Sequence, residues 1–355
     1  MRILHVITSL HTGGAETLVV NMLPRLRALG HEVDIAVFNG ERTALTERLE
    51  RECPECKIYA LGSSYYNPWY IVKLVRIMRK YDVVHTHNSS PQLFAVIANL
   101  FARKKLVTTE HNTNNRKRGN WLLAKIDRWM YTRYNKIICI SDKAEENLRT
   151  YLKSNRNIIT IYNGIDVDAF YKAVPLSIDK ANRFIAVMVA GFRPQKDQDT
   201  LIKAMALLPK DKYELWLVGD GVRRESLESL VKQLDVADSV KFLGLRTDVP
   251  RILKTADVVV MSTHYEGLSL SNIEGMSSGR PFVASDVDGI HEVTDGYGVL
   301  APHEDAEALA SVIKKLAEDR EYYDEVAVRC YQRARQFDIN ETVSGYNKIY
   351  EQLKY

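Results

Sequence analysis

Two carboxylates stand eight positions apart in the segment EGLSLSNIE, which begins at Glu266 and ends at Glu274. An apolar run over residues 257–262 predicts a short strand that leads into this segment, and a helix is expected to begin near Leu270 or Ser271. The free N–H groups of a helix start can bind a phosphate. A carboxylate on each side of that phosphate can accept strong hydrogen bonds from hydroxyl groups. The spacing therefore suits a ligand that carries hydroxyl groups on both sides of a phosphate.

Short polar side chains at Ser269 and Ser271 would leave the backbone amides around this helix start open to a phosphate. Glu266 precedes the expected helix and can reach one side of a ligand, and Glu274, about one turn inside the helix, can reach the other. A structural alternative stays open. Glu274 would then only favour an early helix turn, and Glu266 would be a solvated loop acid.

A basic turn with the sequence GFRPQKD follows the strand that is expected over residues 184–190, and it contains Arg193 and Lys196. Arginine can bind two phosphate oxygens with its planar fork, and lysine acts as a point charge. Such cations stabilise the negative charge that grows on a leaving diphosphate while its bond breaks. An exposed basic turn without a ligand is the alternative interpretation.

Two glycines, Gly13 and Gly14, follow the first expected strand, residues 2–7. Glycine lets backbone amides approach an anion at the start of a helix, so this loop is a further candidate anion site. The dinucleotide-binding fingerprint G-x-G-x-x-G does not occur in the chain. A tight structural turn explains the two glycines equally well.

Histidines stand at two further strand ends. His111 follows the strand that is expected over residues 105–109, and it could bond a hydroxyl group or act as an acid or base. His85 and His87 alternate along the chain, so their side chains face one side of a strand. A typical zinc site needs at least three protein ligands, and no third one was identified for this pair. A structural or ligand-lining role is therefore favoured over a metal site.

The chain has 355 residues, of which 46% are hydrophobic and 26% charged. These values predict a globular protein of two domains. The N-terminal apolar run is too short for a signal peptide and no run is long enough to cross a bilayer, so export is not expected.

Cys53 and Cys56 form a lone C-x-x-C that we interpret as a surface loop rather than a zinc site. All four cysteines suit a reducing cytoplasm.

Charge is distributed unevenly along the chain. Residues 1–175 contain 26 Lys and Arg against 16 Asp and Glu, whereas the remainder contains 23 against 29. Ten of the basic residues lie in the tract 103–136, where aromatic residues are interleaved. The tract predicts contact with an anionic membrane surface, and an ordinary solvated helix with a basic loop is the alternative. Within it, Leu122, Ile126 and Trp129 are spaced as a helical stripe that should face the core.

Strands and helices alternate in two consecutive series. The first series is expected to have strands over residues 2–7, 31–38, 57–60, 81–85, 105–109 and 136–140, and the second over residues 184–190, 213–218, 240–243, 257–262 and 281–285. Two such series predict two doubly wound α/β domains with a linker at about residues 164–180. Ligands of such sheets bind at the carboxyl ends of the strands. The candidate residues all stand at such ends and are expected to line one cleft.

Together these residues resemble the retaining glycosyltransferases of group 1, which have the GT-B fold of two Rossmann-like domains facing a central cleft. The resemblance extends over essentially the whole chain. Its most specific motif is E-x7-E, which Glu266 and Glu274 match. Residues 191–196 look like the family's diphosphate-binding loop, and Gly13 and Gly14 look like the glycine loop of its first domain.

The resemblance implies a role for each candidate residue. Glu274 would hold the ribose hydroxyls of a nucleotide sugar, and Glu266 would hold the hydroxyls of its sugar. Arg193 and Lys196 would hold the diphosphate, and His111 would lie beside the donor sugar. The implied catalytic group is thus His111, Arg193, Lys196 and Glu266, and the implied donor-binding group is Gly13, Gly14, Arg193, Lys196, Ser269, Leu270, Ser271 and Glu274. The family commonly has glycine and proline where this chain has Ser269 and Ser271, which is expected to alter the fit around the sugar.

The resemblance also implies domains and an activity. Residues 1–170, joined by a C-terminal helix at about 338–355, would bind the acceptor, and residues 180–337 would bind the nucleotide sugar. The implied reaction moves a hexosyl unit from a nucleotide-diphosphate sugar, UDP-linked by default, to a hydroxyl of a glycan or lipid-linked acceptor, with retention at the anomeric carbon. Bacterial surface-polysaccharide biosynthesis is the implied context.

No metal is expected, because cations and backbone amides would neutralise the diphosphate. A cofactor and a nucleic-acid partner are not expected either. The expected location is the cytoplasm, with peripheral attachment to the inner face of the plasma membrane through the basic tract. Two other functions stay open. A nucleotide-sugar epimerase can share this fold and donor, and a non-catalytic nucleotide-sugar or glycan-binding protein would bind the donor without turnover.

Overall fold

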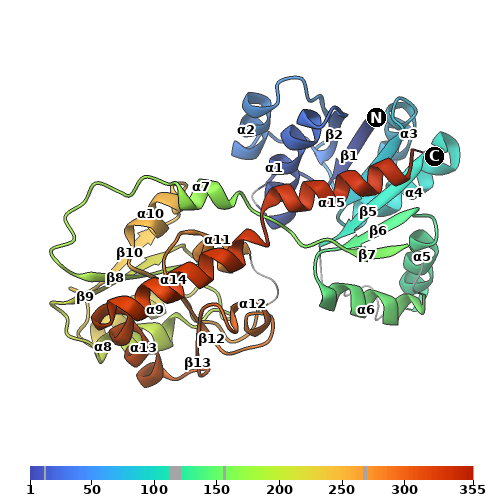
Figure 1. Ribbon diagram of the computed structural model, residues 1–355. Coiled ribbons are helices and arrows are strands. Elements are labelled where there is room, and N and C mark those ends of the chain that lie inside the picture. The colour runs from blue at the N-terminus through green and yellow to red at the C-terminus, as the bar shows by residue number, and fades with distance from the viewer. Residues whose placement is uncertain (12, 112–120, 155–156, 267–269, 355) are drawn as a thin grey trace. The chain divides into compact units, whose positions relative to one another are not determined.

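The computed structural model of the chain describes residues 1–11, 13–111, 121–154, 157–266 and 270–354 (Figure 1). The chain divides into two compact units. Unit 1 comprises Met1–Gly164 and Ile339–Tyr355, and unit 2 comprises Ile165–Asp338. The C-terminal segment thus returns to the unit in which the chain begins.

Unit 1 is built on seven parallel strands in the order β3-β2-β1-β4-β5-β6-β7. The strands are β1 (Arg2–Ile7), β2 (Glu32–Asn39), β3 (Ile58–Gly62), β4 (Val83–His87), β5 (Lys105–Glu110), β6 (Lys136–Cys139) and β7 (Ile158–Thr160). The helices are α1 (Gly14–Ala28), α2 (Ala44–Glu52), α3 (Trp69–Met78), α4 (Ser89–Ala102), α5 (Trp121–Tyr131), α6 (Asp142–Leu152) and α15 (Ile339–Gln352).

Unit 2 is built on six parallel strands in the order β10-β9-β8-β11-β12-β13. The strands are β8 (Phe184–Val189), β9 (Tyr213–Val218), β10 (Val240–Gly244), β11 (Val258–Met261), β12 (Phe282–Ser285) and β13 (Val299–Ala301). The helices are α7 (Val167–Tyr171), α8 (Gln198–Ala206), α9 (Arg224–Gln233), α10 (Val249–Thr255), α11 (Leu270–Ser277), α12 (His291–Thr294), α13 (Ala306–Glu318) and α14 (Arg320–Arg335).

The two sheets share one topology. In each, the first strand of the unit lies in the middle, the next two extend to one side, and the fourth and later strands extend to the other. The strand order therefore reverses between β1 and β4 in unit 1 and between β8 and β11 in unit 2. Ligands of doubly wound sheets bind beyond the carboxyl ends of the strands at this reversal. The topology thus marks one candidate site in each unit.

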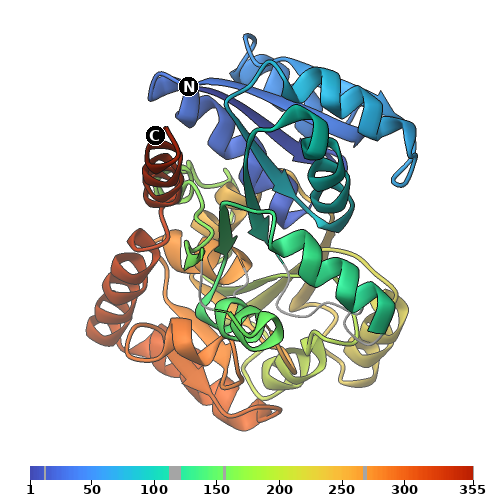
Figure 2. The same cartoon turned by 90° about the vertical axis from the view of Figure 1, so that its right-hand side faces the viewer.

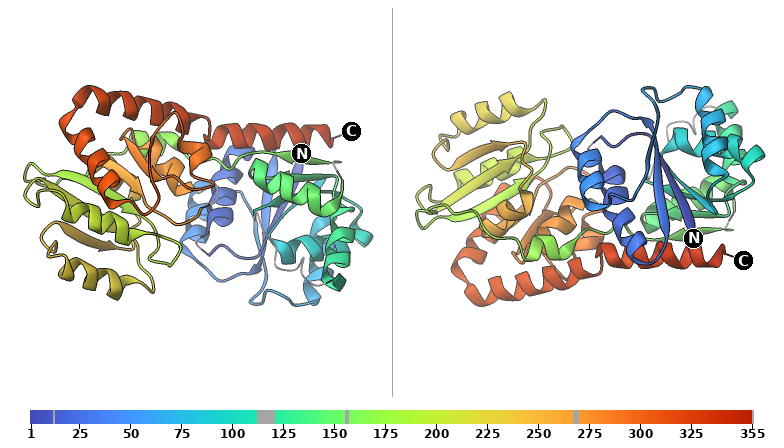
Figure 3. Two further views of the ribbon diagram at one scale, coloured as in Figure 1. Left: turned by 90° about the horizontal axis from the view of Figure 1, so that it is seen from below. Right: turned by 90° about the horizontal axis from the view of Figure 1, so that it is seen from above.

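Apolar burial on both faces of the sheet holds unit 1 together. One cluster joins α1 and α15 to one face through residues such as Leu23 and Tyr346, and a second cluster joins α3 and α4 to the other through Leu74 and Val96 (Figure 2). At roughly 25 cal/mol per Å² of buried apolar surface, this burial is the main stabilising contribution. Figure 3 shows helices of unit 2 around its sheet. One large cluster of apolar side chains extends from the strands to these helices.

Local signals in the sequence set several helix ends. Gly30 follows α1 with a left-handed φ of +87°, the conformation that favours glycine after a helix. The Ser141 side chain accepts from the backbone N–H of Ala144 at 3.2 Å and so caps α6, as expected of a serine at this position. Among the described residues, none of the helices combines the length and the apolar character that crossing a bilayer requires.

The structure confirms the predicted fold class, two doubly wound α/β units, with most strand ends within two residues of the prediction. Two predictions about side chains were wrong. Cys53 and Cys56 are buried rather than on a surface loop, because they pack into the core beside α2. The stripe predicted on α5 was wrong at one position. Ile126 is exposed, whereas Trp129 is partly buried and packs against the core, which also covers Met130 and Tyr131. The side chain of Leu122 lies outside those that the structure describes.

Candidate active site

The glycine loop of unit 1 stands at the reversal between β1 and β4. Gly13 is the N-cap of α1 and has an extended backbone, and Gly14 is the first helical residue. A Cβ atom on Gly13 would lie 2.3 Å from Oε2 of Glu16. Oε1 of Glu16 accepts from Nδ2 of Asn88 at 3.2 Å. Gly13 therefore makes room for a carboxylate that ties the start of α1 to the residue before α4.

A chain of buried histidines ends at His111 in the same unit. Nε2 of His111 lies 3.0 Å from Nδ1 of His87, and Nε2 of His87 lies 3.0 Å from Nδ1 of His5. Nε2 of His5 lies 3.5 Å from the hydroxyl of Tyr350, which lies 2.6 Å from Nδ1 of His85. Register explains the arrangement, since β1 and β4 are neighbours and His5 pairs with His85. We call this chain of side chains the histidine relay.

Burial keeps the histidine relay neutral. It lowers the pKa of His5 to about 3 and that of His111 to about 4, and it holds the pKa values of His85 and His87 well below 6.5, because a low-dielectric interior disfavours the charged ring. Each neutral ring carries a single N–H. Consequently, the position of one proton in the relay determines the positions of the others.

The free end of the histidine relay is Nδ1 of His111, which is buried and has no partner among the described residues. If Tyr350 donates to His85, then His5, His87 and His111 each donate through Nε2, and Nδ1 of His111 is an acceptor. In the reverse arrangement each ring donates through Nδ1, and His111 offers a donor. A ligand hydroxyl can pair with either form.

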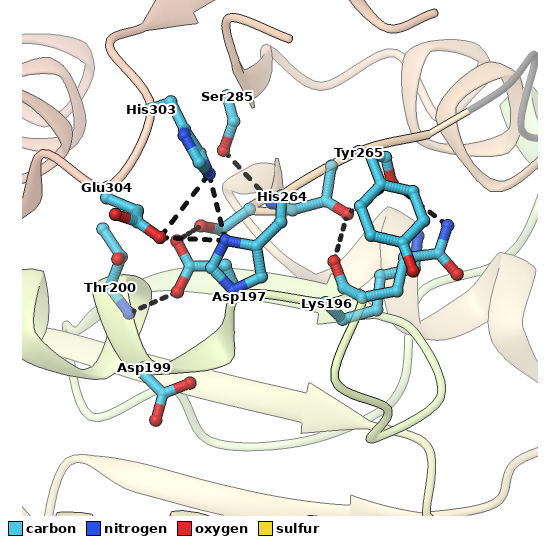
Figure 4. A network of polar contacts seen from close by, with 12 residues as sticks. Lys196, Asp197, Asp199, Thr200, His264, Tyr265, Ser285, His303 and Glu304 are labelled. Atoms are coloured by element: carbon cyan, nitrogen blue, oxygen red, sulfur yellow. Dashed lines mark hydrogen bonds and ion pairs between the residues drawn. The ribbon is translucent and has the colours of Figure 1, made fainter. Parts of the chain in front are cut away.

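The basic turn of unit 2 stands at the reversal between β8 and β11 (Figure 4). Nζ of Lys196, from the turn after β8, forms an ion pair with Oε2 of Glu266, from the turn after β11. Both side chains are only 13% exposed. Nε2 of Gln195 donates to the carbonyl of Tyr265 at 3.0 Å and lies 3.4 Å from Oε1 of Glu266. The two turns thus meet through opposite charges that are largely removed from water.

Backbone contacts fix the position of these charges. Lys196 and Thr263 form an isolated antiparallel bridge, and Oγ1 of Thr263 donates to the carbonyl of Gln195 at 2.9 Å. The backbone N–H of Asp197 donates to the carbonyl of Ser262 at 3.1 Å. Buried polar contacts of this kind specify a single arrangement. The pair of turns is therefore a rigid support for Lys196 and Glu266.

Arg193 and Arg223 have different surroundings. Arg193 is exposed, and its guanidinium forms no hydrogen bond within the part of the chain that the structure describes. Arg223 was not among the sequence-predicted residues. It donates to the carbonyl of Lys196 at 3.0 Å and forms an ion pair with Asp199 at 2.5 Å. Arg223 thus supports the turn that carries Lys196, whereas Arg193 is free to meet a ligand.

Two glycines, Gly219 and Gly221, allow the turn after β9 to pack against the turn after β8, which carries Lys196. A Cβ atom on Gly219 would lie 2.1 Å from the carbonyl oxygen of Ala190, and one on Gly221 would lie 2.5 Å from that of Phe192. Their φ angles of +139° and +155° are also unfavourable for other residues. Only glycine permits this backbone contact, and the sequence signal for it was the Gly219-Asp220-Gly221 turn.

Glu274 lies on α11 and is largely buried. Burial raises the pKa of its carboxyl group from 4.5 to about 7, because the charged form loses hydration there. The carboxyl group has no hydrogen-bond donor within the described part of the chain. Its neighbour Asn272 is fully buried, and both polar atoms of its side-chain amide lack a described partner. Unpaired polar groups at such a position are costly, and a polar ligand would relieve the cost.

The remaining predicted residues surround the start of α11. Leu270 begins the helix and packs against the core of unit 2. Ser271 is partly buried. Ser269 lies outside the described residues. The structure thus brings Lys196 and Glu266 into contact and places Glu274 on the following helix, while Gly13, Gly14 and His111 belong to the other unit.

Sequence reasoning missed Gln195, Arg223 and two members of the histidine relay, His5 and Tyr350. Gln195 belongs to the basic turn but was given no role there, and Arg223 matched no motif. His5 lies inside a strand whose other buried residues are all apolar, and a histidine in such an apolar run is the signal that could have found it. The resemblance implied that a C-terminal helix joins the first domain, but it did not indicate which side chain of that helix would meet the histidines; in the structure Tyr350 of α15 lies against His85.

Comparison with protein families agrees with this geometry. Residues 12–169 match the family model described as Glycosyltransferase Family 4, and residues 176–337 match the one described as Glycosyl transferases group 1. Together the two models cover most of the chain. The chain belongs to the group 1 glycosyltransferases.

Relatives span the whole length of this glycosyltransferase. An uncharacterized glycosyltransferase of Methanocaldococcus jannaschii is 25% identical, with 97% of this chain and 95% of the relative aligned. An N-acetylgalactosaminyltransferase of Campylobacter jejuni that acts on a diacetylbacillosaminyl-diphospho-undecaprenol saccharide is also 25% identical, with 94% of each chain aligned. The coverage shows that family and fold extend over both units.

Among solved structures, Anabaena HepE in complex with UDP has a TM-score of 0.84 at 21% identity and covers 99% of this chain and 100% of its own. This likeness establishes the GT-B fold of the glycosyltransferase. The family establishes transfer of a sugar from a nucleotide sugar as the activity. Neither finding favours an epimerase or a non-catalytic binding protein.

Proposed function

We propose that the glycosyltransferase moves a hexosyl unit from a UDP-sugar to a hydroxyl group of a glycan or lipid-linked saccharide, with retention at the anomeric carbon and without a metal ion. Unit 2 binds the donor and unit 1 binds the acceptor. One observation carries this proposal. Lys196 and Glu266 converge from the turns after β8 and β11 and are held in contact at the strand-order reversal of unit 2.

Donor binding exchanges the partners of this ion pair. The diphosphate takes over Lys196, with Arg193 as its second cation, and the hydroxyl groups of the hexose take over Glu266. Both charges are already largely desolvated, so the site loses little hydration when a ligand replaces the partner. Glu274 accepts hydrogen bonds from the ribose hydroxyls.

Sugar transfer leaves negative charge on the diphosphate, and the cations of the site are placed to stabilise it. The bond between the anomeric carbon and the diphosphate breaks, and a bond to the acceptor oxygen forms on the same face of the sugar. The proton of the acceptor hydroxyl passes to an oxygen of the leaving diphosphate. Lys196 and Arg193 stabilise the negative charge that accumulates there, which a preorganised cation does best in a water-poor site. His111 bonds a hydroxyl group of the donor sugar through Nδ1, the free end of the histidine relay.

Two relatives support the choice of substrates. HepE has the same fold as this chain, and its structure was solved in complex with UDP. This favours uridine as the base of the donor. The Campylobacter relative acts on a diphospho-undecaprenol saccharide, which favours an acceptor of this class and a role in surface-polysaccharide assembly.

A thermal-shift comparison of UDP-, GDP- and ADP-sugars tests the donor. A UDP-sugar at about a hundredfold excess over its Kd should stabilise the protein by about 2.7 kcal/mol, and the Lys196→Ala variant should lose this shift. Lys203 is an exposed lysine on α8, so Lys203→Ala is the matched control and should retain it. The absence of stabilisation by all three classes of donor would refute the proposal. Consumption of the donor without an acceptor would indicate an epimerase.

We also propose that α5 attaches the enzyme peripherally to the inner face of the plasma membrane, so that the enzyme acts in the cytoplasm. Trp121 is 70% exposed, and Leu123 and Ile126 are exposed on the same helix. Nζ of Lys125 lies 4.8 Å from the centre of the Trp121 ring, and Arg128 is exposed next to them. Exposed apolar side chains flanked by cations suit an anionic lipid surface.

Flotation with anionic liposomes at low salt tests this attachment. The wild-type enzyme should float with anionic vesicles and remain in solution with neutral ones. The Trp121→Ala/Ile126→Ala variant should float less, whereas Val328→Ala, which truncates an exposed residue of α14, should float like the wild type. Wild-type enzyme that stays in solution with anionic vesicles would contradict the proposal.

A further inference from the structure

Four side chains with ligand atoms for a metal ion gather at the carboxyl edge of the sheet of unit 2 (Figure 4). His264 follows β11, and His303 and Glu304 follow β13. Asp197 follows β8 and caps α8 through the backbone N–H of Thr200, 3.2 Å away. Figure 4 shows His303 and Glu304 pointing toward His264. Three separate strand ends therefore contribute to one cluster, which we call the His264 cluster.

Three atoms of the His264 cluster form a small triangle. Nδ1 of His264 lies 3.0 Å from Nε2 of His303 and 3.1 Å from Oε1 of Glu304, and the latter two atoms are 3.8 Å apart. Zinc binds imidazole nitrogens and carboxylate oxygens at about 2.0–2.2 Å, which places two tetrahedral ligand atoms about 3.3 Å from each other. The triangle thus has the size of one face of such a coordination shell.

A fourth ligand stands close to the triangle. A carboxylate oxygen of Asp197 and the ligand nitrogens of His264 and His303 all lie within 4.8 Å of one another. Asp197 is buried, and one of its oxygens accepts from Oγ of Ser262 at 3.2 Å. Such supporting hydrogen bonds orient metal ligands in proteins. Two carboxylates and two neutral imidazoles would also balance the double charge of the ion.

Hydrogen bonds alone leave this cluster incomplete. The Nδ1 atom of a neutral His264 ring either accepts from His303 or donates to Glu304, but it cannot do both. A cation accepts a lone pair from all three atoms at once. The cluster is also accessible, since the side chains of His264 and His303 are 31% and 37% exposed. Imidazole with carboxylate suits Zn²⁺ and similar divalent transition metals better than Mg²⁺ or Ca²⁺.

A second histidine cluster suits a metal less well. His5, His85 and His87 also place three nitrogens within 4.8 Å of one another. They are fully buried, and the hydrogen bonds of the histidine relay already engage them. No carboxylate belongs to that group. An ion there would bring an unbalanced double charge into the interior, which is costly.

We propose that the His264 cluster binds one divalent transition-metal ion through His264, His303 and Glu304, with Asp197 as the fourth ligand. The ion holds the turns after β8, β11 and β13 together. It takes no part in sugar transfer, so the proposal goes beyond the proposed function and does not depend on it. Its place is beside the donor site, because Asp197 follows Lys196 directly and His264 is two residues from Glu266.

Metal titration of the untagged, chelator-treated protein tests the site. Calorimetry with Zn²⁺ and the visible absorption of Co²⁺ should both show one ion per chain. The variants His303→Ala and His264→Ala should lose at least about 10–100-fold in affinity, the loss seen even for residues that only support a ligand. Zn²⁺ should raise the Tm of the wild type but not that of the variants. Because both histidines are part-exposed, the variants should fold, which far-UV circular dichroism can verify.

Two control variants separate the possible sites. His291 is an exposed histidine of unit 2 that pairs with Asp286 at 2.6 Å, so His291→Ala should bind the ion like the wild type. His87→Ala should also bind it. Binding that is lost in His87→Ala but kept in His303→Ala would assign the ion to the histidine relay and overturn the proposal. A wild-type protein without a bound ion would overturn it as well.

Discussion

Replacement of Lys196 by alanine should lower kcat/KM by about 10²–10³-fold, the cost of removing one preorganised group that stabilises transition-state charge. Lys196 is largely buried, and its Nζ contacts Glu266, so solvent cannot compensate well for the loss of its positive charge. The loss should appear mainly in kcat, because negative charge on the diphosphate grows as the sugar leaves. Steady-state kinetics with a UDP-sugar donor measure it.

The ion pair requires a control for indirect effects. Lys196→Ala leaves Glu266 largely buried with only the weak contact from Gln195, so part of any loss could come from a displaced carboxylate. A double-mutant cycle with Glu266→Ala separates the two contributions. If Lys196 acts on the diphosphate, the double variant should be slower than either single variant. A double variant no slower than Glu266→Ala would show that Lys196 acts only by positioning Glu266. Lys203→Ala should leave kcat/KM unchanged.

Much of the candidate site followed from the sequence because parallel sheets have a simple geometry. Every strand of such a sheet points the same way, so polar residues after strands must gather at one edge. Lys196 and Glu266 lie 70 residues apart in sequence, yet they contact each other because β8 and β11 are neighbours. The apolar strands and the glycine turns can be recognised from short stretches of sequence, and they show where each strand ends.

Other features could not be predicted, because they depend on which strands become neighbours. The histidine relay requires His5 of β1 beside His85 and His87 of β4 and Tyr350 of α15 against them. The resemblance implied the return of the C-terminal helix, but no local pattern indicates that these particular side chains meet. The position of Ile126 on α5 was mispredicted for a related reason. The buried face of α5 includes Tyr131, whose hydroxyl donates to Glu110 on β5, and helical periodicity alone does not reveal such a contact.

Replacement of Glu274 by glutamine should change activity and stability in opposite directions. Its carboxyl pKa is raised from 4.5 to about 7 by burial, so the folded chain holds a proton that the unfolded chain releases between these values. Below about pH 4 both states are protonated, and the group has no effect on stability. As pH rises through 4.5 toward 7, the folded state becomes progressively less stable relative to the unfolded one. Above pH 7 the full cost is present.

Glutamine removes this cost because it carries no charge. At pH 8 the variant should be more stable than the wild type by up to about 3 kcal/mol, given 1.36 kcal/mol for each pKa unit, and the gain should vanish at pH 4. The uncharged amide replaces a charge-assisted acceptor of ribose hydroxyls with a weaker one, so kcat/KM should fall by about 10²-fold. Urea unfolding at pH 4, 6 and 8, together with donor kinetics, measures both effects.

A gain in stability together with a loss in kcat/KM would indicate that the carboxylate of Glu274 serves ligand binding rather than folding. A glutamate that served only the fold would stabilise it, and its replacement would lower stability while changing activity little. Stabilising substitutions at functional positions, by contrast, typically cost activity. Glu321 is an exposed carboxylate in the first turn of α14, so Glu321→Gln is the control that should leave activity unchanged and lower stability by at most about 1 kcal/mol. A Glu274→Gln variant that unfolds more easily at pH 8 would mean that the carboxylate supports the helix start rather than the donor.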